Sequence, residues 1–439
     1  MKLGIEANCK LSFDYLREKD RTKHVHKLHP YKGKFIPQLV EYFVSSNFKK
    51  GDIILDPFCG SGTTLVQANE LGIHAIGIDV SGFNCLISEV KLLDYDLDSL
   101  EKEIESIQKA IVAYEVDSNI TVFEKELDTR LKEFNRKYFR DEKFDGENYR
   151  REKEKEFLQI YEDLINKYSI ELKQKSEKSF LDRWYVASVR REIDFVFELI
   201  RKIKDIRNKK LLAVVLSRTI RSCRATKHLH LATLRKPQYT TYYCQRHKRI
   251  CRPLFSLGKW FGVYAKDTLR RVKEFNRLKS NSFSCVLAGD SRDLNIFEEV
   301  KKKSSDFYKL LKKQKIRGIF TSPPYVGQID YHQQHAYAYD LFGFERKDDK
   351  EIGSKSLGKS EKAKWNYIDE VSEVLINCRE FMVDDFDIFL VANDKYGLYP
   401  KIAKKAGLRL VRQFVRPVLN RVERNKSAYS EIVFHYVKS

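Results

Sequence analysis

The chain has 439 residues, enough for two or three domains, and a formal net charge of +21, from 83 Lys and Arg against 62 Asp and Glu. Its apolar runs are all shorter than the roughly 18 residues of a membrane-spanning helix, and its first residues lack the apolar stretch and cleavage site of a signal peptide. Eight cysteines lie in mostly unrelated contexts. We therefore expect a cytoplasmic protein, not a membrane protein or a secreted one framed by disulfides.

The first part of the chain alternates short apolar strands with helices. A turn around Pro30–Gly33 precedes an amphipathic helix that begins near Pro37, a good residue for a first helical turn. The segment DIILDPFCGSGTTLVQANELGIHAIGIDVSGFNCLISEV then predicts a strand at Ile53–Pro57, a glycine-rich turn, a helix at Thr63–Leu71, a strand at His74–Asp79 and a helix from Ser81. This alternation predicts a parallel sheet covered by helices on both faces.

From about residue 92 the pattern changes. Residues 97–180 are rich in Glu and Lys with a helical period, and Gly146 is their one glycine, which predicts helices with solvated faces. Further helices are predicted in FLDRWYVASVRREIDFVFELIRKI and KKLLAVVLSRTIRSCR. Strands return with FSCVLAGDSRDL at Phe283, then a strand ending at Phe320 and one at Phe386–Asp394, and LRLVRQFVRPVL and SEIVFHYV form a C-terminal antiparallel pair. We therefore predict one α/β domain, divided by an insertion from about 92 to 282.

The positive charge is concentrated inside this insertion. Between Arg201 and Ser280, 23 Lys and Arg stand against 3 Asp and Glu, a local net charge of +20 (23 − 3). Clustered charge of this kind favours binding of a polyanion, because contacts to phosphates release counterions. The alternative is a basic surface that only keeps the protein soluble.

Acidic residues follow three predicted strands. In DPFCGSGTT, the small residues Gly60, Ser61 and Gly62 let a ligand approach the backbone and a helix N-terminus. The pattern is neither G-x-G-x-x-G nor a P-loop, which argues against a pyrophosphate or a triphosphate. We expect Asp56 to suit a cationic amino-acid moiety, Asp79 to bind two ribose hydroxyls and Asp290 to accept from an adenine amine. Together they describe S-adenosylmethionine, although the turn alone is equally consistent with a helix-capping Asp79.

TSPPY, at Thr321–Tyr325, completes a known combination of motifs. With DPFCGSGTT and HPYKGKFIPQLVEYFV, it resembles the amino-methyltransferases that modify exocyclic amines of DNA bases, whose motifs are Asp-Pro-Phe-x-Gly-x-Gly and Ser/Asp/Asn-Pro-Pro-Tyr/Phe. The resemblance covers about 25–92 and 283–439. It implies a Rossmann-like, S-adenosylmethionine-dependent methyltransferase fold with a mostly parallel seven-stranded sheet, interrupted by a large, mainly helical insertion.

The resemblance also implies the domains and the site. Residues 1–91 and 283–439 would be the two halves of the catalytic domain, and 92–282 the target-recognition region. Expected catalytic residues are Ser322, Pro323, Pro324 and Tyr325. Expected cofactor-binding residues are Lys34, Phe35, Asp56, Pro57, Phe58, Gly60, Ser61, Gly62, Thr63, Asp79 and Asp290.

The chemistry explains the catalytic motif. Ser322 and the carbonyl of Pro323 would accept the two hydrogens of the target amine and free its lone pair for in-line attack on the sulfonium methyl. Tyr325 would stack on a base extruded from the duplex. Tyr331, His332 and Tyr337 would shape the base pocket or pack in the core.

Serine at the first motif position favours cytosine N4 over adenine N6 as the target in this family. We expect a site-specific enzyme acting on double-stranded DNA, with a cognate restriction endonuclease as a candidate partner. The sequence predicts no particular oligomeric state. Adenine-N6 methylation, RNA base methylation and an inactive DNA-binding subunit are the alternatives.

Three features of the basic and C-terminal segments remain open. The insertion carries aromatics that would stack on or insert into DNA: Trp184, Tyr185, Tyr239, Tyr242, Tyr243, Phe255, Trp260 and Phe261. Arg416, Asn420, Arg421 and Arg424 would form a loop that contacts phosphates or the flipped base, or is merely solvated. Cys244, His247 and Cys251, with Cys223, His228 and His230 upstream, would make a small zinc site. Their spacing is not that of a standard finger and separate buried cysteines are commoner, so we expect no metal.

Overall fold

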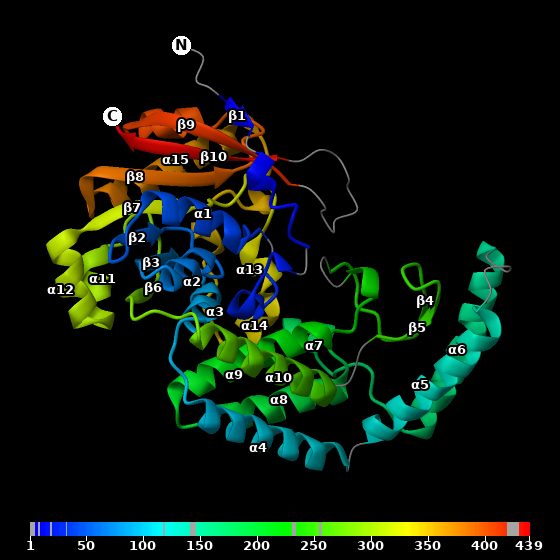
Figure 1. Cartoon of the computed structure of the whole chain (residues 1–439). Helices are drawn as coiled ribbons and strands as arrows, with labels where there is room; N and C mark the ends of the chain where they lie inside the picture. The colour runs from blue at the N-terminus through cyan, green and yellow to red at the C-terminus, as the bar shows by residue number, and fades with distance from the viewer. Residues whose placement is uncertain are drawn as a thin grey trace. The chain divides into compact units, whose positions relative to one another are not determined.

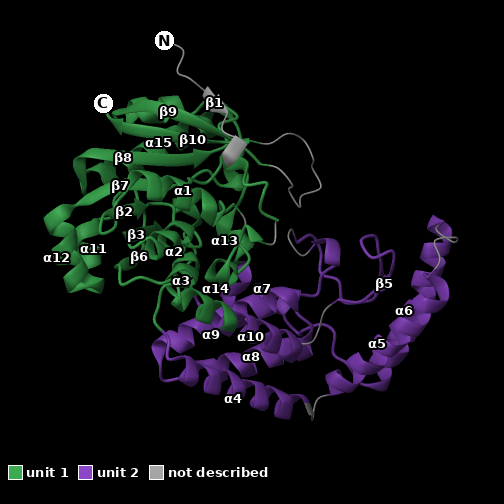
Figure 2. Ribbon diagram, in the orientation of Figure 1, with its two compact units in different colours: residues 1–94, 270–335, 344–439 green, residues 95–269, 336–343 purple. Residues whose placement is uncertain are grey.

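The computed structural model of the chain (Figure 1) describes residues 5–7, 9–17, 20–31, 33–116, 119–140, 146–230, 234–253, 257–418 and 430–439. It divides into two compact units (Figure 2). Unit 1 comprises Met1–Asp94, Arg270–His335 and Phe344–Ser439, and unit 2 comprises Tyr95–Leu269 and Ala336–Gly343. The domain limits expected at 91/92 and 283 stay a prediction, since packing also assigns 336–343 to unit 2 and the segment 270–282 to unit 1.

The described part of unit 1 contains an eight-stranded sheet in the order β1-β9-β10-β8-β7-β2-β3-β6 (Figure 1). β10 is antiparallel to both neighbours, and the other pairings are parallel. The strands are β1 (Ile5–Ala7), β2 (Ile53–Asp56), β3 (His74–Asp79), β6 (Ser284–Ala288), β7 (Ile316–Thr321), β8 (Met382–Ala392), β9 (Leu408–Pro417) and β10 (Ser430–Lys438). The predicted mostly parallel seven-stranded sheet is confirmed, and the short β1 adds an eighth strand beside β9.

Helices cover both faces of this sheet because neighbouring strand residues point to opposite sides. In β2, Ile53 and Leu55 pack into one apolar cluster and Ile54 into another, and all three are fully buried. The first cluster includes α11 (Ile296–Lys303), α12 (Ser305–Gln314), α15 (Glu361–Arg379) and α16 (Tyr399–Lys405). The second includes α1 (Pro37–Asn47), α2 (Thr63–Glu70) and α3 (Gly82–Glu89).

The C-terminal strands form the predicted antiparallel pair, with Val433 opposite Phe414. The four residues expected in a charged loop between these strands differ in where they lie. Arg416 lies in β9, where it is buried and ion-paired with Glu431, so it is not a free loop cation. Asn420, Arg421 and Arg424 lie outside the described residues.

Unit 2 is mainly helical, as expected. Its helices are α4 (Leu97–Val116), α5 (Asn119–Tyr138), α6 (Glu147–Lys167), α7 (Phe180–Trp184), α8 (Ala187–Arg201), α9 (Ile206–Ser222), the first part of α10 (Leu257–Asn276) and α14 (Ala336–Phe342). A two-stranded hairpin, β4 (Tyr242–Cys244) and β5 (Arg249–Cys251), interrupts them. The sequence did not predict this hairpin, because strands of three residues are too short to carry a recognisable period.

The aromatic residues of unit 2 mostly pack inside it. Those with little or no exposed surface are Trp184, Tyr185, Tyr242, Tyr243 and Phe261. Tyr239 and Trp260 are half-buried, and Phe255 lies outside the described residues. The expectation that these rings meet DNA is therefore wrong for the buried five, whose apolar area stabilises the helical fold instead.

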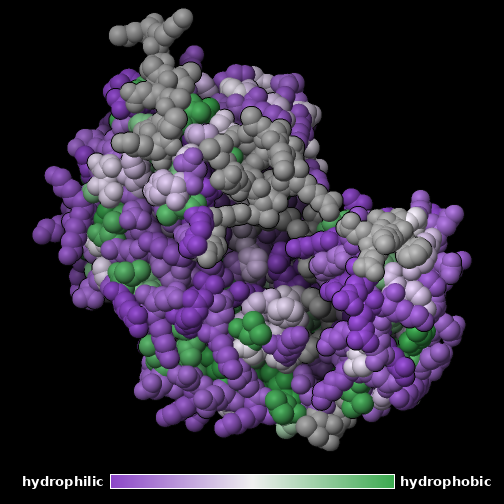
Figure 3. All heavy atoms as spheres, turned by 45° about the vertical axis from the view of Figure 1, so that its right-hand side comes forward, coloured by the Kyte–Doolittle hydropathy of each residue, from purple (hydrophilic) through white to green (hydrophobic). Residues whose placement is uncertain are grey.

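The described helices include none that is long and apolar enough to cross a membrane. The face seen in Figure 3 carries mostly hydrophilic residues, with apolar ones in small separate groups. Small groups of this kind are ordinary on a protein surface and need no binding partner.

Candidate functional site

A cavity opens at the carboxyl edge of the unit 1 sheet, with an empty volume of about 830 Å³ that includes the open solvent at its mouth. Because β2, β3, β6 and β7 are parallel, the residues that follow them meet at this edge. The predicted site residues that line it are Lys34, Phe35, Asp56, Pro57, Phe58, Gly60, Ser61, Thr63, Asp79, Asp290, Ser322 and Pro324. Gly62, Pro323 and Tyr325 do not line this cavity.

Hydrogen bonds with residues of later segments hold the glycine-rich turn in place. Gly60 and Gly62 have φ angles of +49° and +75°, which favour glycine. The Gly60 N–H donates to Asp79 Oδ2 at 2.9 Å, and Ser88 Oγ donates to the Gly60 carbonyl at 2.8 Å. Lys91 donates to the Ser61 carbonyl from a buried position, where burial lowers the pKa of its amine well below the usual value. α3 and the segment just after it therefore support the turn, which the sequence did not reveal.

Asp56 and Asp79 carry carboxyl groups at the ends of β2 and β3, and Asp56 is buried while Asp79 is half-buried. Asp56 Oδ1 accepts from Thr321 Oγ1 at 2.6 Å, and Asp79 Oδ1 accepts from the Ser81 N–H at 2.8 Å and Asn84 Nδ2 at 3.1 Å. Burial raises the pKa of Asp56 to about 6 and that of Asp79 to about 7, against these hydrogen bonds. A cationic or hydroxyl-bearing ligand would stabilise the ionised forms and lower both values.

Asp290 lies in the same cavity but already has a cationic partner. Arg292 donates to both of its carboxylate oxygens, with Nη2 at 2.6 Å from Oδ2. Hydrogen bonds from Arg292 lower the pKa of Asp290, although partial burial opposes this. The carboxylate retains further acceptor positions, so the ion pair restricts Asp290 without removing it as an acceptor.

The segment before α1 and residues far along the chain complete the cavity wall. Tyr31 stacks on Tyr331 with ring centroids 5.7 Å apart, and its hydroxyl accepts from Asn84 Nδ2 at 3.3 Å. Burial raises the pKa of Glu351, which also lines the wall, to about 7. Tyr31, Asn84 and Glu351 were not predicted as site residues. The segment HPYKGK, which contains Tyr31, was the one sequence signal near any of them.

The TSPPY segment borders two cavities. Ser322 and Pro324 line the large one. Tyr325 instead lines a second cavity, together with Asp394, Tyr396 and Tyr399 beyond the end of β8. Tyr325 Oη donates to Glu431 Oε1 at 3.4 Å. The side chain after the two prolines therefore faces a different space from the serine before them.

The predicted aromatic cluster after TSPPY is divided. Tyr331 and His332 line the large cavity of unit 1. Tyr337 is fully buried in unit 2, where Arg224 lies over its ring at 5.5 Å. Tyr337 is therefore a packing residue, as the second interpretation had it.

Comparison with known proteins decides the family. A family model described as DNA methylase matches residues 7–89. Type II methyltransferase M.MjaII of Methanocaldococcus jannaschii is 46% identical over 445 residues, which cover 99% of this chain and 84% of that protein. The chain belongs to the type II DNA amino-methyltransferases.

Other relatives match this methyltransferase only locally. Type II methyltransferase M.BsoBI of Geobacillus stearothermophilus is 36% identical over 91 residues, which cover 20% of this chain and 18% of that protein. A tRNA (guanine(10)-N2)-dimethyltransferase of Methanocaldococcus jannaschii is 40% identical over 78 residues, or 16% of this chain and 22% of that protein. The similarity over nearly the whole chain is therefore to a DNA enzyme.

Methyltransferases of this family use S-adenosylmethionine as methyl donor. The large cavity fits such a group, because the carboxyl groups of Asp56, Asp79 and Asp290 line it and can accept from the hydroxyl and amine groups of the donor. Ser61 Oγ is also buried without a hydrogen-bond partner in the described part of the chain. A buried polar atom of this kind calls for a ligand or water to satisfy it.

Proposed function

We propose that the protein is a site-specific DNA methyltransferase that transfers a methyl group to N4 of cytosine. The choice of cytosine N4 rests on the serine at the first position of the catalytic motif, and one observation supports the transfer itself: Ser322 lines the cavity that fits the methyl donor, while Tyr325, three residues later, lines a second cavity. A base in the second cavity would bring its amine to the TSPPY segment. Methyl donor and acceptor would then meet at that segment.

Unit 1 residues would hold the donor by its polar groups. Asp79 would accept from the ribose hydroxyls. Its carboxylate accepts from the Gly60 N–H of the glycine-rich turn and therefore lies beside the turn that the ribose would approach. Asp56 would face the amino-acid end, and Asp290 would accept from the adenine amine with its remaining lone pairs. Lys34 and Phe35, which line the same cavity, would close over the methionine end.

Ser322 and the Pro323 carbonyl would activate the target amine. The amine is a poor nucleophile, because its lone pair is conjugated with the ring. Accepting both of its hydrogens would favour a pyramidal nitrogen whose lone pair can attack in line with the breaking carbon–sulfur bond. The new nitrogen–carbon bond then forms as the sulfur leaves with its electron pair, and one amine proton is lost to solvent. The two prolines would restrict the backbone so that both acceptors keep their positions.

The target base would leave the duplex to reach the second cavity. Tyr325 offers a ring for stacking, and Asp394 and Tyr396 offer polar groups to the base edge. Asp394 is partly held, because its Oδ1 accepts from the Leu398 N–H at 2.7 Å. A polar pocket lined by aromatic rings suits a single extruded base better than an intact base pair.

Unit 2 would recognise the DNA, and unit 1 would form the catalytic domain, near the expected limits of 1–91, 92–282 and 283–439. The hairpin turn supports this division of roles, because Arg246, Lys248 and Arg249 are exposed there and none has an acidic partner in the described chain. Such side chains suit phosphate contacts. A type II methyltransferase also suggests a cognate restriction endonuclease as partner.

Nucleoside mass spectrometry would test the proposal. The protein is expressed in a host without modification enzymes, and the genomic DNA is digested to nucleosides. We expect N4-methylcytosine. N6-methyladenine would retain the site and contradict the base assignment, while methylated RNA without methylated DNA would contradict the DNA substrate. A host expressing the Ser322→Ala variant is the matched control and should show little of either mark.

A further inference from the structure

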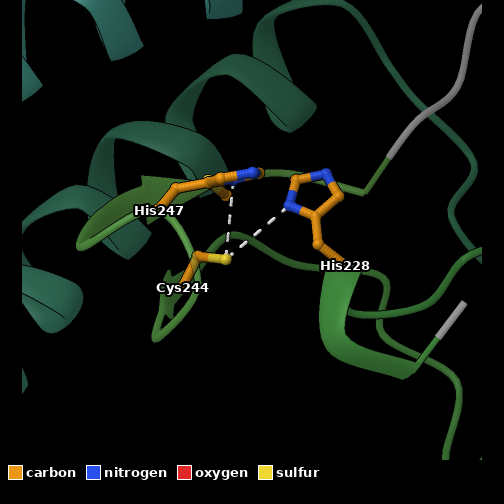
Figure 4. Close-up of side chains that lie close together, drawn as sticks. His228, Cys244 and His247 are labelled. Atoms are coloured by element: carbon orange, nitrogen blue, oxygen red, sulfur yellow. Dashed lines mark hydrogen bonds between the residues drawn. The ribbon is translucent and has the colours of Figure 1, made fainter. Parts of the chain in front are cut away.

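Two histidines and two cysteines of unit 2 converge on one point. They are His228, Cys244, His247 and Cys251, and their candidate ligand atoms all lie within 4.8 Å of one another. In Figure 4, dashed lines join the Cys244 sulfur to a ring nitrogen of His228 and to one of His247. Cys244 and Cys251 are buried, and both are free thiols. From this cluster we propose that the protein binds one structural Zn²⁺ ion, held by these four side chains.

Three of the six separations among the ligand atoms match those of a tetrahedral zinc site. Zinc–sulfur bonds of about 2.3 Å and zinc–nitrogen bonds of about 2.0–2.1 Å place tetrahedral ligand atoms roughly 3.4–3.8 Å apart. Cys244 Sγ lies 3.8 Å from His228 Nδ1 and 3.7 Å from His247 Nδ1, and His247 Nδ1 lies 3.4 Å from Cys251 Sγ. A set of two thiolates and two imidazoles in this geometry selects Zn²⁺ among the common metals.

The hairpin that carries three of the ligands needs such a cross-link. Its strands, β4 and β5, have three residues each, and the buried apolar cluster between them comprises Tyr242, Cys244 and Cys251. An isolated two-stranded hairpin is marginal in water, and small units with little core commonly use a metal or disulfide. A zinc ion would join the hairpin to the 3-10 helix His228–His230, whose first residue already donates its N–H to Tyr242 Oη at 2.7 Å.

The second strand of the hairpin is also anchored to α5. The metal would add an anchor between the hairpin and His228. Asn135 in α5 brackets Ile250, with Nδ2 donating to its carbonyl at 2.9 Å and Oδ1 accepting its N–H at 3.0 Å. Arg252 pairs with Glu124 and Asp128 of the same helix. Between these anchors, the turn presents Arg246, Lys248 and Arg249 to solvent. The zinc ion would therefore determine where the hairpin holds three basic side chains.

A second group of residues of metal-binding types lies in unit 1, but it does not support another metal site. His24, His26 and Glu70 lie close together. However, Lys23 Nζ is 2.6 Å from Glu70 Oε2 and His24 Nε2 is 2.8 Å from Oε1. The lysine ammonium already supplies the positive charge, so we expect one zinc per chain and not two.

Metal content tests the proposal without any reference to activity. Protein purified without chelator is analysed for zinc by mass spectrometry, and we expect one equivalent per chain. After chelation, Co²⁺ should restore one equivalent and give the absorption of a tetrahedral site with two thiolates. Metal-free purified protein that also fails to give this cobalt spectrum would overturn the proposal, and so would a Cys244–Cys251 disulfide found by thiol counting.

Neighbouring residues provide matched variants. His228→Ala should lower zinc content several-fold, while His230→Ala, in the same short helix but outside the cluster, should retain one equivalent. If His228→Ala fails to fold, Cys251→Ser in the cobalt assay replaces it, because removal of one thiolate should weaken the sulfur-to-cobalt absorption. S-adenosylmethionine binding to unit 1 should be unchanged in His228→Ala. Equal zinc in both histidine variants would contradict the assignment.

Discussion

At the scale of single residues, the proposed chemistry of unit 1 depends on side chains that follow the ends of its strands. Ser322 lies after β7 at the cavity shared with Asp56 and Asp79. Removing its hydroxyl by Ser322→Ala should reduce the rate of methyl transfer on the order of 10²-fold, because the amine then has one acceptor fewer. Cofactor affinity should change little, since the cavity keeps its acids. Single-turnover kinetics and calorimetric titration measure the two effects separately.

A matched serine controls for this substitution. Ser45 in α1 is exposed and its hydroxyl contacts a carbonyl of its own helix. Ser45→Ala should leave both the rate and the cofactor affinity unchanged. An equal loss of rate and affinity in Ser322→Ala would assign the serine to cofactor binding and not to the amine.

The acids Asp56 and Asp79 predict a pH dependence of cofactor binding. Burial raises the pKa of Asp56 to about 6 and that of Asp79 to about 7 in the ligand-free protein. The ionised forms accept hydroxyl and ammonium hydrogens, so affinity should be full about one pH unit above the higher value, at roughly pH 8, and fall as pH decreases through both values. Below about pH 6 the loss should approach tenfold per pH unit for one required deprotonation.

Titration calorimetry from about pH 5 to pH 8 checks this dependence. Repeating it in buffers of different ionisation enthalpy counts the protons released on binding. Asp79→Asn should weaken cofactor binding at pH 8. It should also remove the change of affinity with pH that the titration of Asp79 causes. A dissociation constant independent of pH in the wild-type protein would rule out a role for these carboxylates.

At the scale of elements, the turn between β2 and α2 depends on glycine. Gly62 has a φ of +75°, and a Cβ there would lie 2.9 Å from Ser88 Cβ in α3. Gly62→Ala should therefore lower the free energy of unfolding by about 2–4 kcal/mol, from left-handed backbone strain and overpacking together. Gly397, with a φ of +63° and nothing within 4 Å of its Cβ position, separates the two causes.

Gly397→Ala should cost only about 1 kcal/mol, because the backbone strain is present there without the overpacking. Urea denaturation of both variants gives the comparison, and cofactor titration should weaken for Gly62→Ala alone. Similar losses of stability in the two variants would mean that α3 moves aside and does not hold the turn.

At the scale of the whole molecule, the charge of +21 predicts DNA binding that is strongly salt-dependent. Replacing Arg246, Lys248 and Arg249 by alanine should reduce the slope of log affinity against log salt by about 0.9 for each DNA phosphate that these side chains neutralise. The measurement is fluorescence anisotropy with a labelled duplex at several salt concentrations.

Three exposed lysines of α11 are the control for charge. Lys301, Lys302 and Lys303 lie on a helix that covers a face of the catalytic sheet. Their replacement by alanine removes the same charge, yet should leave the salt slope nearly unchanged. Equal changes of slope in both triple variants would show that net charge, and not the hairpin, determines the salt dependence.

The sequence by itself determined the strands, the turns and the acids that follow them. The strand at His74–Asp79, the helix beginning at Pro37 and the C-terminal pair are all present, because burial period and turn chemistry are local properties. Parallel pairing then brings Asp56, Asp79 and Ser322 to one edge. That inference needs only the direction of the strands, so most of the lining of the candidate site could be predicted without coordinates.

Tertiary structure alone decided the contacts between distant side chains. It places Tyr337 and Tyr331 in different units, and supports the glycine turn with the buried Lys91, 30 residues away. It also joins His228 to Cys244, 16 residues later, while leaving Cys223 and His230 outside the cluster. No local period encodes such choices, because they depend on how separate elements pack and which side chains that packing brings within reach.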